Sequence, residues 1–293
     1  MKQNGFLPKL SLLIATIIWG TTFFIMEGTL ENIGIFTLLA LRFTIAAILL
    51  VAVLVKRLHK IDKTHIFQGF ILGLLIIIAY AFQTYGLADE GTTPGKNAFL
   101  TAIYCVLVPF MAWAFTHEKP DRYNITAAIM CIIGITLISV SGNDFSSICK
   151  GDLLTLASGI FFGIHIIAVP VFSKGRDILL LTMLQIIFSA LLAWIPALTM
   201  ETFPVCLPSS GIYSILYLGI MATCGCYLLQ NIGQKFTKPA AASLILSLEA
   251  VFGVLFSVIF TSEIVTPRIF AGFVIVFLAI VISEIKPFSK NNK

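Results

Sequence analysis

Ten apolar runs of about 20 residues each succeed one another along this chain of 293 residues. A helix needs roughly 20 residues to cross the hydrocarbon core of a bilayer. Each run is therefore long enough to span a membrane, and the linkers between the runs are short. The runs lie at 10–27, 33–55, 66–87, 96–115, 123–141, 152–172, 178–200, 211–232, 239–260 and 268–285. The sequence predicts an all-α membrane protein with ten transmembrane helices.

Composition excludes the main soluble classes of protein. Hydrophobic residues make up 58% of the chain and charged residues only 11%, whereas soluble domains are about 45–50% apolar and about 25% charged. A water-soluble domain and a disordered chain each need far more polar sequence. The net charge of +5 comes from basic residues in separate short linkers, which form no continuous stripe. We therefore expect the lipid bilayer and a small-molecule substrate as partners, and no nucleic acid.

An enzymatic function is not expected. Ten spans leave no room for a soluble catalytic domain, and the runs contain no HExxH motif, no paired aspartates and no convincing serine–histidine pair. His165 has no second His, Cys or carboxylate at ligand spacing, so no metal site is predicted. The glycine-rich phosphate-binding loop of nucleotide-driven pumps is absent from the sequence. No cofactor is expected, and an ion gradient or the substrate's own gradient would have to drive transport.

The distribution of Lys and Arg predicts the orientation. If the N-terminus is cytoplasmic, the cytoplasmic segments hold 15 of these residues, the outer segments hold 3, and Arg42 lies within a span. Positive residues concentrate on the cytoplasmic side of membrane proteins. Both termini are therefore predicted to face the cytoplasm, with the chain in the plasma (inner) membrane. The same count supports the number of spans, because a missed helix would scramble the alternation.

The two halves of the chain align with each other at offsets of 143 and 145 residues. The aligned pairs include Pro94 with Pro239, Ala98 with Ser243, Glu118 with Glu263, Gly20 with Gly163 and Arg42 with Gln185. The third and eighth runs align less well. Five spans per half give two repeats of opposite orientation, at 1–145 and 146–293, within one membrane unit. Inverted repeats are typical of secondary transporters, whose substrate site lies near the midplane between the repeats. The alternative is an old duplication kept for packing alone.

Several short motifs accompany the repeat. They are Trp19-Gly20, Arg42-Phe43, the segment 94–101 leading through Tyr104 to Val108-Pro109, the segment 240–249, Glu263 and Gly272. In their order and spacing the chain resembles the EamA group of the drug/metabolite transporter superfamily, over almost its whole length. The resemblance implies transport of small solutes, amino acids among them, and names no substrate. The family often has Glu-Pro in the ninth span, where this chain has Glu249-Ala250, which puts the helix bend expected there in doubt.

The leading hypothesis is a secondary active transporter of a small metabolite, an amino acid or a similar solute. It would work by alternating access around a cavity at the midplane, and the resemblance favours an exporter. The alternative is a multidrug or quaternary ammonium exporter, because an aromatic cavity with one carboxylate suits a cation. A channel is disfavoured by the inverted repeat. Ten spans can enclose a cavity alone, so we expect a monomer or a weak homodimer.

Glu249 is the main candidate for proton coupling. It lies near the middle of the run 239–260 among apolar neighbours. Ionisable groups at this depth are costly and usually mark function. Desolvation favours the protonated carboxyl group, so such a group can carry a proton in exchange for substrate. A buried structural hydrogen bond or ion pair is the competing interpretation.

Arg42 and Lys96 are the other charge candidates. Arg42 attracts an anionic substrate or pairs with Glu249 or Glu27, and we favour a structural role for it. Lys96 opens the fourth span, where Thr92 or Thr93 can cap the helix and Pro94 suits its first turn. The free amides and Lys96 would form an outer gate that attracts carboxylates, or an ordinary capped helix with a snorkelling lysine. Pro109 is expected to kink the same helix.

A wider set of polar and aromatic residues supplies the predicted cavity. Ligand pockets combine apolar walls with a few polar groups. His165 aligns with Thr22 and titrates near physiological pH, although a satisfied histidine of the bundle is equally consistent. For each aromatic residue, core packing is the competing interpretation. A looser set consists of Gln83, Tyr85, Tyr104, Gln230 and Asn231. The predicted substrate-binding residues are Trp19, Thr22, Phe23, Tyr80, Gln83, Tyr104, His165, Tyr227, Gln230 and Glu249.

Overall fold

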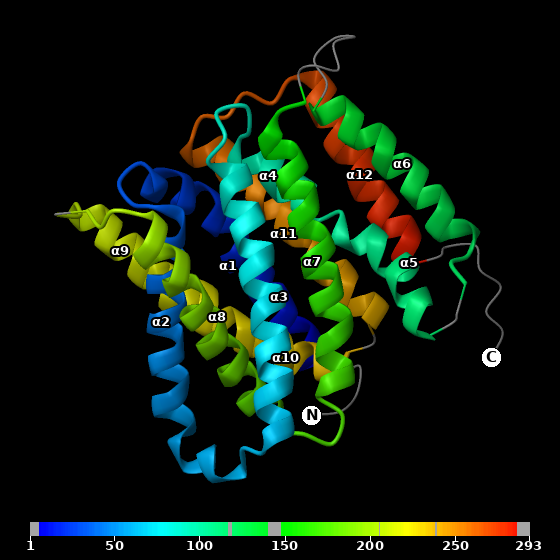
Figure 1. The fold of residues 1–293 in the computed structure, drawn as a ribbon. Helices are drawn as coiled ribbons and strands as arrows, with labels where there is room; N and C mark the ends of the chain where they lie inside the picture. The colour runs from blue at the N-terminus through cyan, green and yellow to red at the C-terminus, as the bar shows by residue number, and fades with distance from the viewer. Residues whose placement is uncertain (1–5, 117–118, 140–147, 205, 238, 286–293) are drawn as a thin grey trace.

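The computed structural model describes residues 6–116, 119–139, 148–204, 206–237 and 239–285. These ranges contain helices and loops but no β-strand, which confirms the all-α prediction. Figure 1 shows the helices packed side by side as one bundle. The helices are α1 (Phe6–Leu30), α2 (Ile35–Leu54), η1 (Val55–Lys60), α3 (Lys63–Leu87), α4 (Pro94–Thr101), α5 (Tyr104–Thr116), α6 (Arg122–Ser139), α7 (Lys150–Phe172), α8 (Ile178–Met200), α9 (Ser209–Tyr217), η3 (Leu218–Gly225), α10 (Cys226–Phe236), α11 (Pro239–Phe260) and α12 (Pro267–Ile285).

Seven helical segments in the described ranges are long and apolar enough to cross a membrane. They are Phe6–Leu30, Ile35–Lys60, Lys63–Leu87, Pro94–Trp113, Lys150–Phe172, Ile178–Met200 and Ser209–Phe236. Three shorter apolar helices, at 122–138, 245–260 and 267–282, follow the same order as the remaining predicted runs. The chain is a multi-pass membrane protein, and the count of ten spans stays a prediction.

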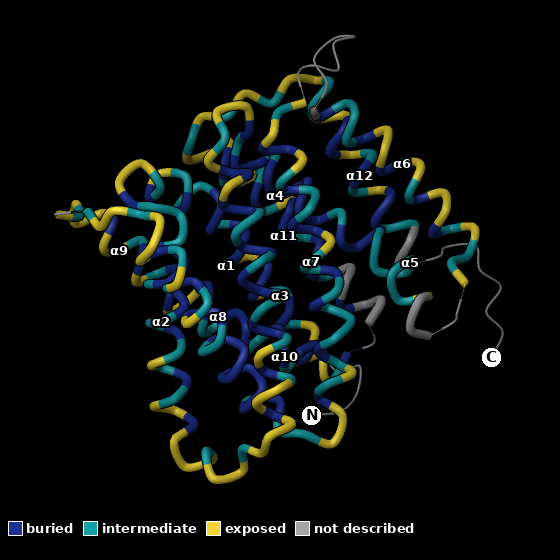
Figure 2. Tube along the Cα trace, in the orientation of Figure 1, coloured by how far each residue is buried: buried dark blue, intermediate teal, exposed yellow. Residues whose placement is uncertain are grey.

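The distribution of buried and exposed side chains is also that expected of a membrane protein. Figure 2 shows buried residues concentrated between the helices and exposed residues on their outward faces. Many outward side chains of the long helices are large and apolar, for example Ile132, Leu198 and Phe270, which are 66%, 65% and 62% exposed. Apolar side chains on outward helix faces are expected where the surrounding solvent is lipid.

Contacts between the two halves come in matched pairs. Helix α1 packs against α11, and α7 correspondingly packs against α4 and α5. Helix α3 packs against α7 and α8, and η3 and α10 correspondingly pack against α1, with η3 also against α2. The pairs α2–α8 and α6–α12 are each their own counterpart. In Figure 1, α1 leads up from the N-terminal end whereas α7 leads down toward α8, so these equivalent helices run in opposite directions.

Parts of the repeat prediction fall outside the described residues. The boundary between 145 and 146 lies in one such gap, and Glu118 lies in another. The same holds for Lys2, Lys238, Lys286, Lys290 and Lys293, which entered the charge count.

Helix starts are fixed by oxygen atoms that accept from the first free amides. Thr93 caps α4 by accepting from the Lys96 N–H at 3.2 Å, and Pro94 occupies the first turn, as predicted. Asp62 and Asp177 cap α3 and α8 in the same way. A side chain next to these amides satisfies donors that the helix itself cannot.

Two interruptions shape the bundle. The fourth run forms two helices, α4 and α5, which are separated at Ala102 and Ile103. A Cβ atom on Gly159 of α7 would lie 3.0 Å from the Thr101 carbonyl oxygen, so α7 approaches this break closely. Pro109 lies inside α5, seven residues beyond Ala102. The sequence predicted a kink in this helix but not the break before it.

The second interruption is a π-helix, η3, between α9 and α10. The Thr223 hydroxyl donates to the Leu218 carbonyl oxygen at 2.7 Å, and the Trp19 indole donates to the Ala222 carbonyl oxygen at 2.8 Å. A π-helix takes more residues per turn than an α-helix. The equivalent helix α3 is unbroken, which accounts for the poor alignment of the third and eighth runs.

The connecting loops meet at two ends of the bundle, which we name the inner and outer ends after the predicted orientation. At the inner end, Arg57 pairs with Asp177 at 2.9 Å and Arg176 pairs with Asp62 at 3.2 Å. At the outer end, Glu201 accepts from the Phe36 N–H at 2.8 Å. Loops that the charge alternation assigns to one side of the membrane therefore come together in the structure.

Candidate functional site

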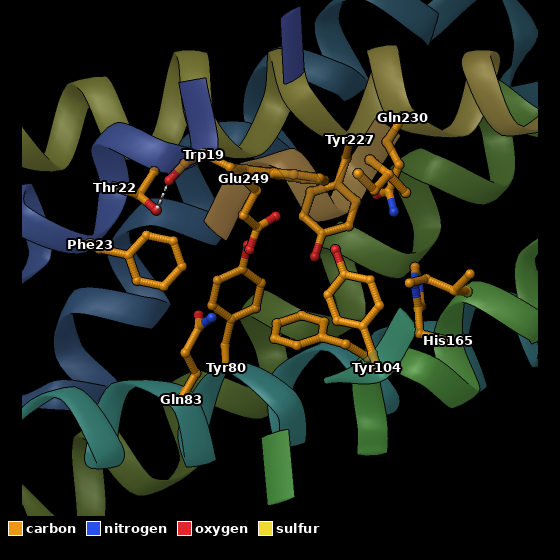
Figure 3. A pocket seen from close by; sticks show the side chains of 13 residues that line it. Trp19, Thr22, Phe23, Tyr80, Gln83, Tyr104, His165, Tyr227, Gln230 and Glu249 are labelled. Carbon is orange, nitrogen blue, oxygen red and sulfur yellow. Dashed lines mark hydrogen bonds between the residues drawn. The ribbon is translucent and has the colours of Figure 1, made fainter. Parts of the chain in front are cut away.

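A small cavity lies between the two halves, bordered by α1, α3, α5, α7, α10 and α11. All ten predicted substrate-binding residues line it, and Figure 3 shows their side chains directed toward one space. Their role in binding stays a prediction. The lining residues are Trp19, Thr22, Phe23, Tyr80, Gln83, Tyr104, Phe162, His165, Ile166, Tyr227, Gln230, Leu246 and Glu249.

Three wall residues were missed by the sequence reasoning. Phe162 and Ile166 lie three residues before and one residue after His165, and Leu246 lies three residues before Glu249. Residues three or four apart share a helix face. Helical spacing from the polar residues was therefore the signal that would have found Phe162 and Leu246.

The cavity is small. Its volume open to water-sized spheres is about 40 Å³, and one water needs about 10–15 Å³ on this measure. The space holds a few water molecules and excludes an organic solute of several carbon atoms. Binding of such a solute therefore requires the surrounding helices to part.

Glu249 is the only carboxylate among the described lining residues, and that set contains no Lys or Arg. The residue is 8% exposed. Among the described residues, its carboxyl group has no ion-pair partner within 4.0 Å and no hydrogen-bond partner. The competing interpretation of Glu249 as a partner in a buried ion pair therefore finds no support in this structure.

Three tyrosines surround Glu249. Figure 3 shows the hydroxyl groups of Tyr80, Tyr104 and Tyr227 pointing into the same space as its carboxyl group. Trp19 packs edge-on against Tyr227, with ring centroids 5.6 Å apart. The Thr22 hydroxyl is directed back to the Trp19 carbonyl oxygen at 2.7 Å and so makes its hydrogen bond within α1.

The His165 and Gln83 side chains each use one polar atom in a hydrogen bond to a surrounding helix. The His165 Nε2 atom lies 3.1 Å from the Gln185 Oε1 atom. This contact occupies one ring nitrogen of His165, and the other, Nδ1, has no hydrogen-bond partner among the described residues. The Gln83 side-chain amide donates to the Thr101 hydroxyl at 3.1 Å, which leaves its oxygen as an acceptor. The polar groups of the cavity thus favour a ligand that donates hydrogen bonds.

Arg42 lies behind the cavity wall and does not line the cavity. It is fully buried, and its guanidinium carbon lies 4.6 Å from the centroid of the Tyr80 ring. Its Nε atom donates to the Thr223 hydroxyl at 3.0 Å. No described carboxylate lies within 4.0 Å of it, so the predicted pairing with Glu249 or Glu27 is wrong.

Lys96 lies at the outer end, away from the cavity. Its ammonium group pairs with the buried Asp152 carboxylate at 2.8 Å. Glu263 occupies the start of α4: it accepts from the Gly95 N–H at 3.0 Å and from the Thr93 hydroxyl. The prediction of free amides that attract substrate carboxylates is therefore wrong, because a carboxylate of the chain already binds there.

The outer end also has an acidic hollow of about 330 Å³. Its lining includes the four carboxylates Glu27, Glu31, Asp89 and Glu90. It adjoins the cavity region, because Glu27 lies four residues beyond Phe23 on α1. Four like charges in one concavity produce a negative potential that attracts cations.

Of the looser set, Gln83, Tyr104 and Gln230 line the cavity, whereas Tyr85 and Asn231 do not. The Tyr85 side chain is 43% exposed on another face of α3. Asn231 donates to the Thr182 hydroxyl at 2.7 Å.

Comparison with known proteins identifies the family. The sequence profile of the EamA-like transporter family matches twice, at residues 8–140 and 149–284. This chain belongs to the EamA-like transporter family. The two matches to this EamA-like transporter correspond to the two halves of the bundle, and the resemblance noted in the sequence is confirmed.

Relatives of this EamA-like transporter include an uncharacterized transporter of Archaeoglobus fulgidus, 29% identical over 277 residues that cover 94% of this chain and 85% of the relative. The uncharacterized transporter YwfM of Bacillus subtilis is 23% identical over 288 residues, which cover 97% of this chain and 96% of YwfM. A solved structure shares the fold with a TM-score of 0.70, at 16% identity, covering 95% of this chain and 96% of that one.

Proposed function

We propose that this EamA-like protein is a secondary active transporter of a small organic solute that carries an ammonium or other cationic group. The unpaired Glu249 carboxyl group in a cavity without described Lys or Arg residues carries this proposal. A charged carboxylate is costly at this depth unless a proton or a cation neutralises it. The tyrosine hydroxyl oxygens around it add hydrogen-bond acceptors for an ammonium group.

The cationic class is preferred over a zwitterion for a specific reason. An amino acid would place its ammonium group at Glu249, but its own carboxylate would meet no Lys or Arg among the described lining residues. The two basic candidates, Arg42 and Lys96, are bound elsewhere. The acidic hollow at the outer end matches the same charge preference. Amino acids with an additional cationic side chain remain within the proposed class.

Transport would proceed by alternating access between two inverted five-helix repeats with ten spans in total. The matched contacts between the halves and the double family match support this architecture. A proton and the cationic solute would compete for Glu249, so release of one accompanies binding of the other. An inward proton gradient would then drive export across the plasma membrane, with a single chain as the transport unit.

Counterflow in proteoliposomes tests this function. The panel contains a diamine, a quaternary ammonium ion, lysine and leucine, and pH gradients are imposed in both directions. We expect saturable uptake of at least one cationic member, altered by the gradient, and little uptake of leucine. Glu249→Gln keeps the size of the side chain and should abolish the effect of the gradient. Leucine transport that is unchanged in Glu249→Gln would overturn the proposal.

A further inference from the structure

Polar side chains join α3, α4 and α7 at the outer end. The Asn97 side-chain amide donates to the Thr155 hydroxyl at 2.7 Å, across the boundary between the two halves. Lys96 and Asp152 form a second contact across the same boundary. Gln83 continues the series toward the cavity through its hydrogen bond to Thr101. We call Gln83, Lys96, Asn97, Thr101, Asp152 and Thr155 the outer seam.

The outer seam is deeply buried. Asn97, Thr101 and Thr155 are 0% exposed, and Asp152 is 1% exposed. Buried polar groups are costly unless they find partners, and paired ones fix a single arrangement of the helices. The polar contacts of the outer seam therefore fix one arrangement of α3, α4 and α7.

Three of the equivalent positions at the inner end are apolar. At the offset of 145 residues, Asn97 and Thr101 align with Ala242 and Leu246, and at 143 residues Thr155 aligns with Leu12. None of these three counterparts has a polar side-chain atom, whereas Gln83 and Asp152 correspond to the polar residues Gln230 and Lys9 at offsets of 147 and 143 residues. Leu12, Ala242 and Leu246 are buried in one apolar cluster.

The packing supports this equivalence. Thr155 of α7 lies against Gly86 of α3, where a Cβ atom would collide with its hydroxyl oxygen. Leu12 of α1 lies against Gly233 of α10 in the same manner. In both interfaces the first helix of one half thus contacts a glycine near the end of the third helix of the other half. The two interfaces share their geometry and differ in chemistry.

We infer that the outer seam is a latch that holds the outer gate closed, and that Gln83 connects this latch to the cavity. The inference rests on the alternating access proposed above. Opening the outer end must separate Asn97 from Thr155 and Lys96 from Asp152, both of which are directional contacts. Opening the inner end separates apolar side chains, which tolerate sliding, and the solvent-exposed ion pairs Arg57–Asp177 and Arg176–Asp62, which contribute little stability in water. Gln83 belongs to both the cavity wall and the seam, so a solute that binds its amide group competes with Thr101.

Thiol labelling from the outer side tests the latch. Phe162→Cys places a reporter in the cavity wall, in a background carrying Cys149→Ser and Cys206→Ser, and a membrane-impermeant maleimide is applied to vesicles of known orientation. Asn97→Ala introduces the residue found at the inner counterpart. We expect it to raise the rate of labelling about threefold to tenfold, the effect of removing the buried hydrogen bond that crosses between the halves. The variant also removes the hydrogen bond from Asn97 to the Gln83 carbonyl oxygen at 3.2 Å, within the first half.

Asn231→Ala is the matched control. It removes a hydrogen bond of the same type and length, from Asn231 to Thr182 at 2.7 Å, but between α10 and α8 within one half. We expect it to change the labelling rate by less than about twofold. Equal effects of the two variants, or no increase with Asn97→Ala, would overturn the inference.

Thr155→Val provides a second route if Asn97→Ala yields no folded protein. It keeps the shape of the side chain and removes the hydroxyl acceptor, and it should raise labelling to a similar extent. The labelling needs no solute. A failed search for a cationic substrate therefore leaves the latch result standing, and absence of a labelling effect leaves the transport assay standing.

Discussion

The guanidinium group of Arg42 lies 4.6 Å from the centroid of the Tyr80 ring, so a fully buried cation supports one wall of the cavity from behind. Tyr80 in turn presents its hydroxyl group toward Glu249 (Figure 3). Arg42 therefore acts on the cavity through the position of Tyr80, as a positioning residue that a bound solute need not touch.

Arg42→Lys should weaken both the fold and solute binding. A lysine cannot cover the Tyr80 ring with a planar group and also donate to Thr223 as Arg42 does. We expect a loss of about 1–3 kcal/mol in the free energy of unfolding and a higher KM for the transported cation. Thermal unfolding in detergent and transport kinetics check the two effects. Arg57→Lys, at an exposed ion pair, is the control and should change neither the stability nor the KM. An unchanged KM in Arg42→Lys would contradict the positioning role.

Gly20→Ala should push α1 away from α11. A Cβ atom on Gly20 would lie 3.0 Å from the backbone carbonyl carbon of Phe252, and closer still to its Cβ atom. Overpacking of this kind costs about 1–3 kcal/mol. Gly28→Ala on the same helix has no atom within 4 Å of the added Cβ, and should be neutral or stabilising by about 0.5–1 kcal/mol. The melting temperatures of the two variants are compared, and a Gly20→Ala variant as stable as Gly28→Ala would contradict this packing.

Glu201→Gln should loosen the outer end of α2. The Glu201 carboxylate accepts from the Phe36 and Thr37 N–H groups, each at 2.8 Å, and from the Thr37 hydroxyl at 2.8 Å. A charged acceptor at a helix N-terminus forms stronger hydrogen bonds than an amide. We expect a loss of about 1–2 kcal/mol in stability, measured by thermal unfolding. Glu90→Gln in the α3–α4 loop serves as the control, and equal melting temperatures for the two variants would count against the cap.

Asp62→Asn should lower stability near neutral pH, and the difference should disappear in acid. The His65 N–H hydrogen bond, with the His65 and Arg176 side chains, holds the pKa of Asp62 at about 2, below its usual value of 3.8. A carboxyl group with a lowered pKa in the folded state stabilises it fully above the unfolded value and loses this effect as the pH falls through the folded value. The melting temperatures of the two proteins should therefore converge between about pH 4 and pH 2. A difference that persists at pH 2 would mean that the charge of Asp62 is not responsible.

The membrane class and the cavity residues could be predicted because both follow from local sequence. Apolar length defines a span, and a polar residue such as Glu249 at that depth must face the protein interior. The repeat supports this, since Tyr104 aligns with Glu249 at the offset of 145 residues and both line the cavity.

The partners of charged residues could not be predicted. Which way a helix is rotated about its axis is not fixed by a single sequence, so Arg42 was equally compatible with a carboxylate and with Tyr80. The anion at the start of α4 came from Glu263, which lies 170 residues away from Thr93 along the chain. The outer seam went unnoticed because Asn97 and Thr155 lie 58 residues apart along the chain, and only the structure shows that they are in contact.

The π-helix between Leu218 and Gly225 sets the rotation of α10 about its axis. A π-helix takes more residues per turn than an α-helix, in which each residue turns the following segment by about 100°. Rewinding the same residues as an α-helix would therefore rotate α10 and carry Tyr227 and Gln230 out of the cavity wall. The local winding of the backbone thus decides which side chains of α10 a solute can meet.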